Sequence, residues 1–141
     1  MADGSYTPLH HAALHGDTRT VQLLLHTNRD MIKATDKDRN TPLHLAVWKS
    51  HKDVAELLLD NDAPIHAMNH FGNTPLHLAA WTGHTGVVDL LLRKCAKIEK
   101  TNHYVKTPLH LAVSRRNTGV VEALLGAGGS IEALDSNHNT P

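Results

Sequence analysis

Histidine is the residue type in this chain with the greatest capacity for chemistry, since 13 of the 141 residues are histidines. A neutral imidazole can bind a metal ion or carry a proton near neutral pH. His11 and His15 stand four residues apart, a spacing that places two imidazoles on one face of a helix. Zinc signatures need further Cys, His or carboxylate ligands at defined spacing, and none follows these two. We therefore predict no metal site.

Four other histidines end a recurring Thr-Pro-Leu-His tetrapeptide: His10, His44, His77 and His110. Recurrence at one fixed position favours a structural role, in which a buried imidazole must find hydrogen-bond partners. The remaining histidines fit surface or turn positions: His26, His51, His66, His70, His84, His103 and His138.

Other arrangements for catalysis are missing from the sequence. It contains no Gly-x-Ser-x-Gly elbow and no glycine loop that could cradle a phosphate. The single cysteine, Cys95, cannot form an intramolecular disulfide, and its close sequence neighbours are lysines. We expect no catalytic residue, no cofactor and no enzymatic activity.

Charge and hydropathy limit the partners and the location. The chain has 14 basic and 14 acidic residues, so no overall field draws it to nucleic acid or to an anionic membrane. No apolar run is long enough to span a membrane or to act as a signal peptide. The sequence thus disfavours nucleic acid as partner and predicts an intracellular protein, cytoplasmic or nuclear, without membrane insertion.

The elements that hold these residues recur along the chain. Thr-Pro-Leu-His begins at Thr7, Thr41, Thr74 and Thr107, and a fifth Thr-Pro begins at Thr140. The successive starts are 34, 33, 33 and 33 residues apart. A period in this range indicates a stack of supersecondary units, each of which buries its apolar face against the next.

Each unit predicts two short helices. Thr74 can cap a helix that begins with Pro75, and Gly83 permits the left-handed conformation that ends it. A second amphipathic helix is expected from about Thr85 to Lys94. Isolated helices of this length are marginal in water, so stability must come from stacking between units.

The motif and its period resemble ankyrin repeats over nearly the whole chain. The resemblance implies an all-α repeat solenoid of helix-turn-helix units with projecting β-hairpin fingers, as one ankyrin domain over residues 1–141. The repeats would be 2–35, 36–68, 69–101 and 102–134, with a partial fifth at 135–141. It also implies that the signature His hydrogen-bonds to the signature Thr, and that fingers and first helices line a concave binding surface.

The two ends of the array differ. Repeat one carries His11 and Thr20 where later repeats have apolar residues, as a terminal cap requires. It also contains one extra residue, within Thr27 to Ile32. Repeat four keeps the apolar pattern, so we expect an uncapped face at that end through which copies can self-associate.

Three glycine positions of ankyrin repeats are occupied by other residues here. The resemblance implies a positive φ before the signature Thr, at the end of the first helix and after the second helix. Val105, Arg116 and Cys95 occupy such positions. We expect strain or a different turn at Val105, whereas Asn28 and Asp62, at the position equivalent to Cys95, tolerate the left-handed region.

All five aromatic residues fall at positions that we expect on the surface. Tyr6, Phe71 and Tyr104 fall in finger segments, and Trp48 and Trp81 both fall four residues after the signature His. We expect two exposed ladders, typical of an interface hot spot. An alternative is that the rings only cover apolar edges between repeats. The predicted partner-binding residues are Tyr6, Trp48, Lys49, Phe71, Asn73, Trp81, Thr82, Tyr104, Lys106, Ser114 and Arg115.

These residues predict a protein–protein interaction scaffold that binds a protein or peptide on its concave face. Lys49, Lys106 and Arg115 would select a partner with an acidic rim. An alternative is a phosphorylated ligand or single-stranded RNA stacked on the tryptophans and held by the same basic residues. A third interpretation is a spacer or an engineered binder.

Overall fold

The computed structural model of the chain describes residues 5–132 and 137–141. Over these ranges it contains eight α-helices, one 3-10 helix and no β-strand. The first helices of the successive units are α1 (Pro8–His15), α3 (Pro42–Trp48), α5 (Pro75–Thr82) and α7 (Pro108–Ser114). The second helices are α2 (Thr18–Thr27), α4 (Lys52–Asp60), α6 (Thr85–Arg93) and α8 (Thr118–Gly126), and η1 (Arg29–Lys33) follows α2.

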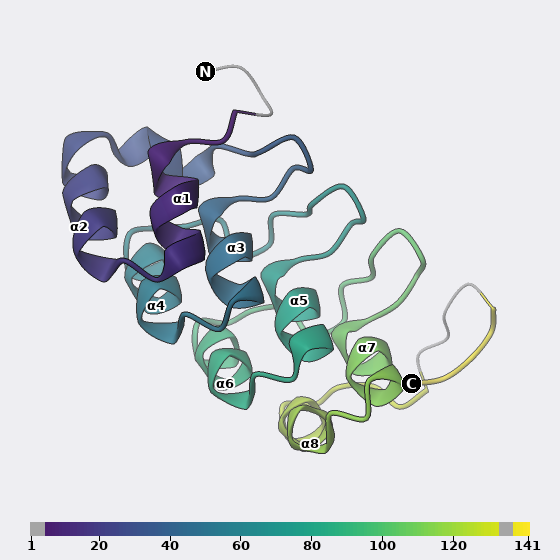
Figure 1. The fold of residues 1–141 in the computed structure, drawn as a ribbon. Coiled ribbons are helices and arrows are strands. Elements are labelled where there is room, and N and C mark those ends of the chain that lie inside the picture. Colours follow the sequence, from purple (N-terminus) through teal and green to yellow (C-terminus); the bar gives the residue numbers. More distant parts are fainter. Residues whose placement is uncertain (1–4, 133–136) are drawn as a thin grey trace.

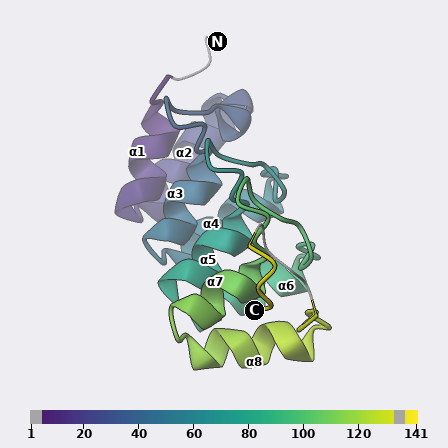
Figure 2. The same ribbon diagram turned by 90° about the vertical axis from the view of Figure 1, so that its right-hand side faces the viewer.

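The helices form two layers of a regular array. The first helices α1, α3, α5 and α7 lie side by side in one layer, and α2, α4, α6 and α8 form the other (Figure 1). Long loops project beyond the first layer, all on the same side (Figure 1), and the view at 90° shows them stacked along the array (Figure 2). The predicted all-α repeat array is confirmed.

Each first helix begins with the same reciprocal cap. In repeat three the Thr74 hydroxyl accepts from the backbone N–H of His77, and the Thr74 backbone N–H donates to His77 Nδ1 at 3.1 Å. Two backbone donors that a helix start leaves unpaired are thereby satisfied. Proline follows the threonine at the first helical position, where its missing N–H costs nothing.

The core lies between the two helix layers and continues from unit to unit. Small alanines on the first helices are fully buried, Ala46 and Ala79 among them, and allow neighbouring helices to approach closely. Branched residues of the second helices fill the remaining space, as Val54 and Leu58 do. Leu43 and Leu76, one residue after the helix-starting prolines, are also buried.

The predicted fingers are tight turns. Asn69 N–H donates to the Asn73 carbonyl at 3.0 Å, and Asn102 N–H donates to the Lys106 carbonyl at 2.9 Å. We call residues 36–40, 69–73 and 102–106 the fingers. Neighbouring fingers are joined by one backbone hydrogen bond each, such as His103 N–H to the Phe71 carbonyl at 3.0 Å. In the described residues they hold no β-strand, because each turn pairs too few residues to make a ladder.

Positive φ occurs at most of the expected positions. The values are 59° at Val105, 56° at Arg116, 66° at Cys95 and 66° at Asp62. The expectation for Asn28 is wrong, since its φ is −148°. The extra residue of repeat one changes this turn: Asn28 caps η1, and its side chain accepts from Asp30 N–H.

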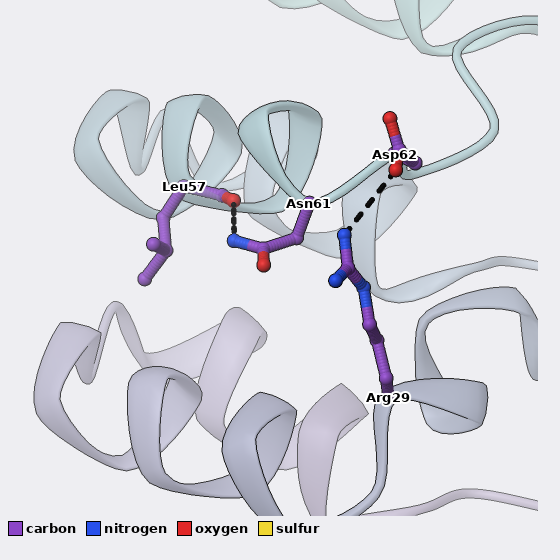
Figure 3. Close-up of polar contacts among 4 residues, drawn as sticks. All are labelled: Arg29, Leu57, Asn61 and Asp62. Carbon is purple, nitrogen blue, oxygen red and sulfur yellow. Dashed lines mark hydrogen bonds and ion pairs between the residues drawn. The ribbon is translucent and has the colours of Figure 1, made fainter.

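Exposed ion pairs link adjacent units. Figure 3 shows Arg29 reaching the Asp62 carboxylate, with 3.2 Å between Nη2 and Oδ2, beside Asn61, whose amide donates to the Leu57 carbonyl. Lys94 pairs likewise with Asp60. These side chains are exposed, so each pair contributes roughly 0 to 1 kcal/mol.

Both ends of the array expose apolar side chains. At the N-terminal end His11 is exposed and Thr20 half-buried, but Leu23 is also 61 % exposed, which the sequence did not predict. At the other end Leu125 is 41 % exposed. The last described segment still contributes to repeat four, because the Asn139 carbonyl accepts from His110 Nε2.

Candidate binding groove

A groove of about 730 Å3 lies between the fingers and the first helices. Repeats two to four supply nearly all of its described lining: Asn40, His44, Leu45, Trp48, Asn69, Phe71, Asn73, Leu78, Trp81, Asn102, Tyr104, Lys106, Leu111 and Asn137. Its volume is in the range of pockets that enclose a small ligand or a short peptide segment.

Four aromatic rings line this groove. Trp48 and Trp81 come from α3 and α5, and Phe71 and Tyr104 come from successive fingers. Between 37 % and 55 % of each residue's surface is exposed, the lowest value being that of Trp81 and the highest that of Tyr104. Among the described residues these four rings do not stack on one another. The groove therefore offers exposed aromatic surface to a ligand.

Asparagine amides form the finger side of the groove. Asn102 Oδ1 accepts from the backbone N–H groups of Tyr104 and Lys106, so its amide nitrogen must be the group that donates to Asn73 Oδ1, at 2.9 Å. The amide nitrogen of Asn73 is then left without a protein partner among the described residues. Asn69 bonds to Asn40 in the same way.

Of these amides the sequence predicted only Asn73. The signal for the others was present, because Asn69 and Asn102 both stand five residues before a signature threonine. Asn40 and Asn73 both stand one residue before it. An asparagine that recurs at the same position of successive repeats, outside the four-letter signature, indicated a row of amides that hydrogen-bond from one repeat to the next.

A column of buried histidines supports the groove from beneath. His44 Nδ1 accepts from Thr41 N–H, which makes Nε2 the donor to the Asn73 carbonyl at 2.9 Å. His77 donates in the same way to the Lys106 carbonyl. Each imidazole thus fixes the groove residue that precedes the signature threonine of the next repeat. The predicted bond between the signature His and Thr is confirmed.

Burial controls the protonation of these histidines. Desolvation lowers the pKa of His44 and of His77 to about 4, against an ordinary value of 6.5. The hydrogen bonds to the Asn73 and Lys106 carbonyls oppose this shift. The pKa of His10 is lowered for the same main reason. At neutral pH these imidazoles are therefore neutral.

The predicted basic residues differ in their relation to the groove. Lys106 lines it, and the Arg115 guanidinium lies 4.6 Å from the centre of the Trp81 ring. Lys49 is exposed at the end of α3 and does not line the groove. The described lining contains no Asp or Glu.

Three further predicted site residues lie outside the groove. Tyr6 is exposed and stacks on the His10 ring at 5.5 Å. The hydroxyls of Thr82 and Ser114 donate to backbone carbonyls of their own helices. The structure thus brings six of the predicted residues together: Trp48, Phe71, Asn73, Trp81, Tyr104 and Lys106.

Some histidines outside the signature join adjacent units, which the sequence did not predict. His51 Nε2 donates to the Leu14 carbonyl at 2.9 Å, and His66 Nε2 accepts from Lys97 N–H at 3.1 Å. The rings of His11 and His15 lie 4.4 Å apart. No third metal ligand joins them, and no group of three such ligands occurs in the described residues.

Comparison with known proteins decides the family. A family profile described as ankyrin repeats (3 copies) matches residues 2–69 and 62–135. The chain belongs to the ankyrin repeat family. Ankyrin repeats generally mediate protein–protein interaction, and the family is typically a non-enzymatic scaffold. In the described part of this ankyrin chain, no helix has the length and apolar character needed to cross a membrane.

One curated relative of this ankyrin chain is similar to it over only part of each sequence. Ankyrin repeat domain-containing protein 13C of Danio rerio is 46% identical over 57 residues. The match covers 40% of this chain but 11% of that protein. The likeness therefore concerns repeat architecture and carries nothing about the rest of the relative.

Proposed function

We propose that this chain recognises a protein partner through the concave groove between its fingers and first helices. The observation that carries the proposal is the gathering of four exposed aromatic rings in one groove. Tryptophan and tyrosine dominate the energetics of interfaces because they bury a large area at low entropic cost. Trp48, Trp81, Phe71 and Tyr104 serve as the anchors.

Charge restricts the partner. Arg115 against Trp81 and Lys49 at the end of α3 place positive charge beside the aromatic rings. The partner therefore carries acidic residues around the segment that enters the groove, which speeds association and selects against basic partners.

The test is affinity capture from a cell extract with a tryptophan double variant, Trp48→Ala/Trp81→Ala. We expect the wild-type protein to retain partners that the variant loses. Tyr6→Ala is the matched control, because Tyr6 is an exposed ring outside the groove, and it should retain them. Circular dichroism of each variant establishes that the helices are intact.

Two results contradict the proposal. Partners retained equally by the double variant would show that the groove is not the binding surface. Displacement of the retained material by a short oligouridylate, with a steep loss of affinity between 50 and 200 mM salt, would support single-stranded RNA instead.

A further inference from the structure

The two tryptophans of the groove differ in what covers them. In the repeat after Trp48, the residue that directly follows the equivalent tryptophan is Thr82, and its hydroxyl donates a hydrogen bond to the Leu78 carbonyl. The corresponding residue for Trp81 is Arg115, whose guanidinium lies 4.6 Å from the ring centre. Among the described residues no cation lies over the Trp48 ring, whereas the Arg115 guanidinium covers the Trp81 ring.

An apolar part of the groove forms the first subsite. Leu45 and Leu78 line the groove with Trp48 and Phe71. Leu78 is nearly buried, whereas about half of the Phe71 surface is exposed. A large apolar side chain of a ligand fits between these groups and removes their exposed area from water.

The second subsite is an anion site at Arg115. A guanidinium held over an aromatic face keeps the N–H donors at its edge available for a carboxylate. Among the described residues no Asp or Glu forms an ion pair with Arg115. Recognition of a phosphate group typically uses a cluster of arginines, and a single guanidinium beside an apolar groove suits a carboxylate better.

The spacing of the two subsites selects a backbone conformation. The Arg115 guanidinium lies over Trp81, which stands one repeat after Trp48, so the two subsites are separated by about one helix spacing. Packed helix axes such as those of α3 and α5 are about 8 to 10 Å apart. In polyproline II, residues three apart lie on the same side of the chain, about 9 Å from one another. In an extended strand, residues on one side lie about 7 Å or 13 Å apart, which fits less well.

Hydrogen-bond donors in the groove favour the same conformation. In the described chain, neither the indole N–H groups of Trp48 and Trp81 nor the Asn73 amide nitrogen donate to a protein acceptor. A polyproline II segment has no internal hydrogen bonds and leaves its carbonyl groups free to accept. A helical ligand uses its central carbonyls internally. Aromatic-lined grooves recognise polyproline II segments in this way.

We propose that the groove binds a polyproline II segment of a partner protein in which a large apolar residue and an Asp or Glu stand three positions apart. The apolar side chain lies against Trp48, and the carboxylate pairs with Arg115. This inference rests on the proposed function and narrows its partner to one class of peptide.

The probes are acetylated and amidated octapeptides. The first, Pro-Pro-Leu-Pro-Pro-Asp-Pro-Pro, has the proposed spacing, and Pro-Pro-Asp-Pro-Pro-Leu-Pro-Pro presents it in the opposite direction. Each of these two peptides has three comparison peptides. The first replaces Asp by Asn, the second moves Asp to two positions from Leu, and the third carries phosphoserine in place of Asp. Affinities are measured by isothermal titration calorimetry with the whole chain.

We expect one of the two directions to bind about tenfold more tightly than its Asn and two-position counterparts, since a charge-assisted hydrogen bond at a partly desolvated site is worth about that factor. Arg115→Gln should remove this preference, and Trp48→Ala should weaken every peptide. The matched control is Arg93→Gln, which removes the same charge at the exposed end of α6, and it should keep the preference.

Several outcomes overturn the inference. They are no binding of either direction, equal binding of the Asp and Asn peptides, a preference that survives Arg115→Gln, or tighter binding of phosphoserine than of Asp. If these occur while extract capture still depends on the tryptophans, the groove binds another kind of protein segment and the proposed function stands. If capture also fails, both proposals fall.

Discussion

The left-handed backbone at Val105 allows a sharp test of the finger geometry. A β-branched residue is a genuine outlier at positive φ, and Val105 has a φ of 59° at the position that Gly72 occupies, with φ 76°, in the previous repeat. We expect Val105→Gly to stabilise the array, because glycine adopts this φ without steric cost.

The magnitude follows from three effects. Strain at such a residue is on the order of 1 to 3 kcal/mol. Glycine adds freedom to the unfolded chain, which costs about 0.4 to 1 kcal/mol. Val105 is 44 % exposed, so loss of its side chain forfeits about half of the roughly 1.5 kcal/mol that a buried valine contributes. The expected gain in unfolding free energy is roughly 0.5 kcal/mol.

The sharper comparison is with Val105→Ala, which removes the same packing but keeps a Cβ at positive φ. Alanine in the left-handed region costs about 1 to 2 kcal/mol, so the Gly variant should exceed the Ala variant by about 1 kcal/mol. Urea unfolding followed by circular dichroism measures both, with slopes compared to ensure that the transitions are alike.

The reverse change, Gly72→Val, is not a matched control. A Cβ at Gly72 would lie 2.7 Å from the His103 backbone nitrogen, which belongs to the bond between adjacent fingers. A Gly variant at position 105 that is no more stable than the Ala variant would refute the reasoning. It would show that the finger rebuilds itself at negative φ in solution.

Acid should destabilise the fold. The pKa of His44 and of His77 is near 4 in the folded chain and near 6.5 in the unfolded chain, so the unfolded chain binds more protons between these values. The stability that comes from keeping these histidines neutral is therefore present above about pH 6.5 and is lost as the pH falls toward 4. The loss is about 2 kcal/mol per histidine by pH 5, and a urea midpoint that stays flat from pH 7 to 5 would contradict it. Lys94→Ala should change the unfolding free energy by less than about 0.5 kcal/mol, since its partner Asp60 is half exposed; a loss above about 1 kcal/mol would show a stronger pair. Leu125→Glu should reduce any concentration-dependent association seen by sedimentation velocity, because Leu125 is an exposed apolar residue on the α8 face of the array. If association joins opposite ends of two copies, Leu23→Glu suppresses it as well, and association unchanged by Leu125→Glu excludes that face.

Residues that act within one repeat could be predicted from the sequence. Thr74, Pro75 and His77 form a helix start among themselves, so the four-letter signature was sufficient to place every first helix. The resemblance to ankyrin repeats predicted positive φ at Val105 and Cys95, because the turn returns at a fixed step whatever residue occupies it. It failed at Asn28, where one added residue let a different local structure form.

Interactions between repeats could be predicted from the sequence only in part. The sequence placed Trp48 and Trp81 in register, and both do line one groove. The Arg115 contact with Trp81 depends on how far one repeat is displaced and rotated relative to the next. That displacement is set by packing of buried side chains over the whole interface, which no single repeat contains.

The sequence by itself determined the unit, its period and the exposed position of its aromatic residues, because capping, turn conformation and helical periodicity act over a few neighbouring residues. Only the tertiary structure decided which of the predicted residues share a groove. It separated Tyr6, Thr82 and Ser114 from the rest and added Asn69 and Asn102. The bonds between the groove amides join residues 29 positions apart, and the stacking of complete units decides them.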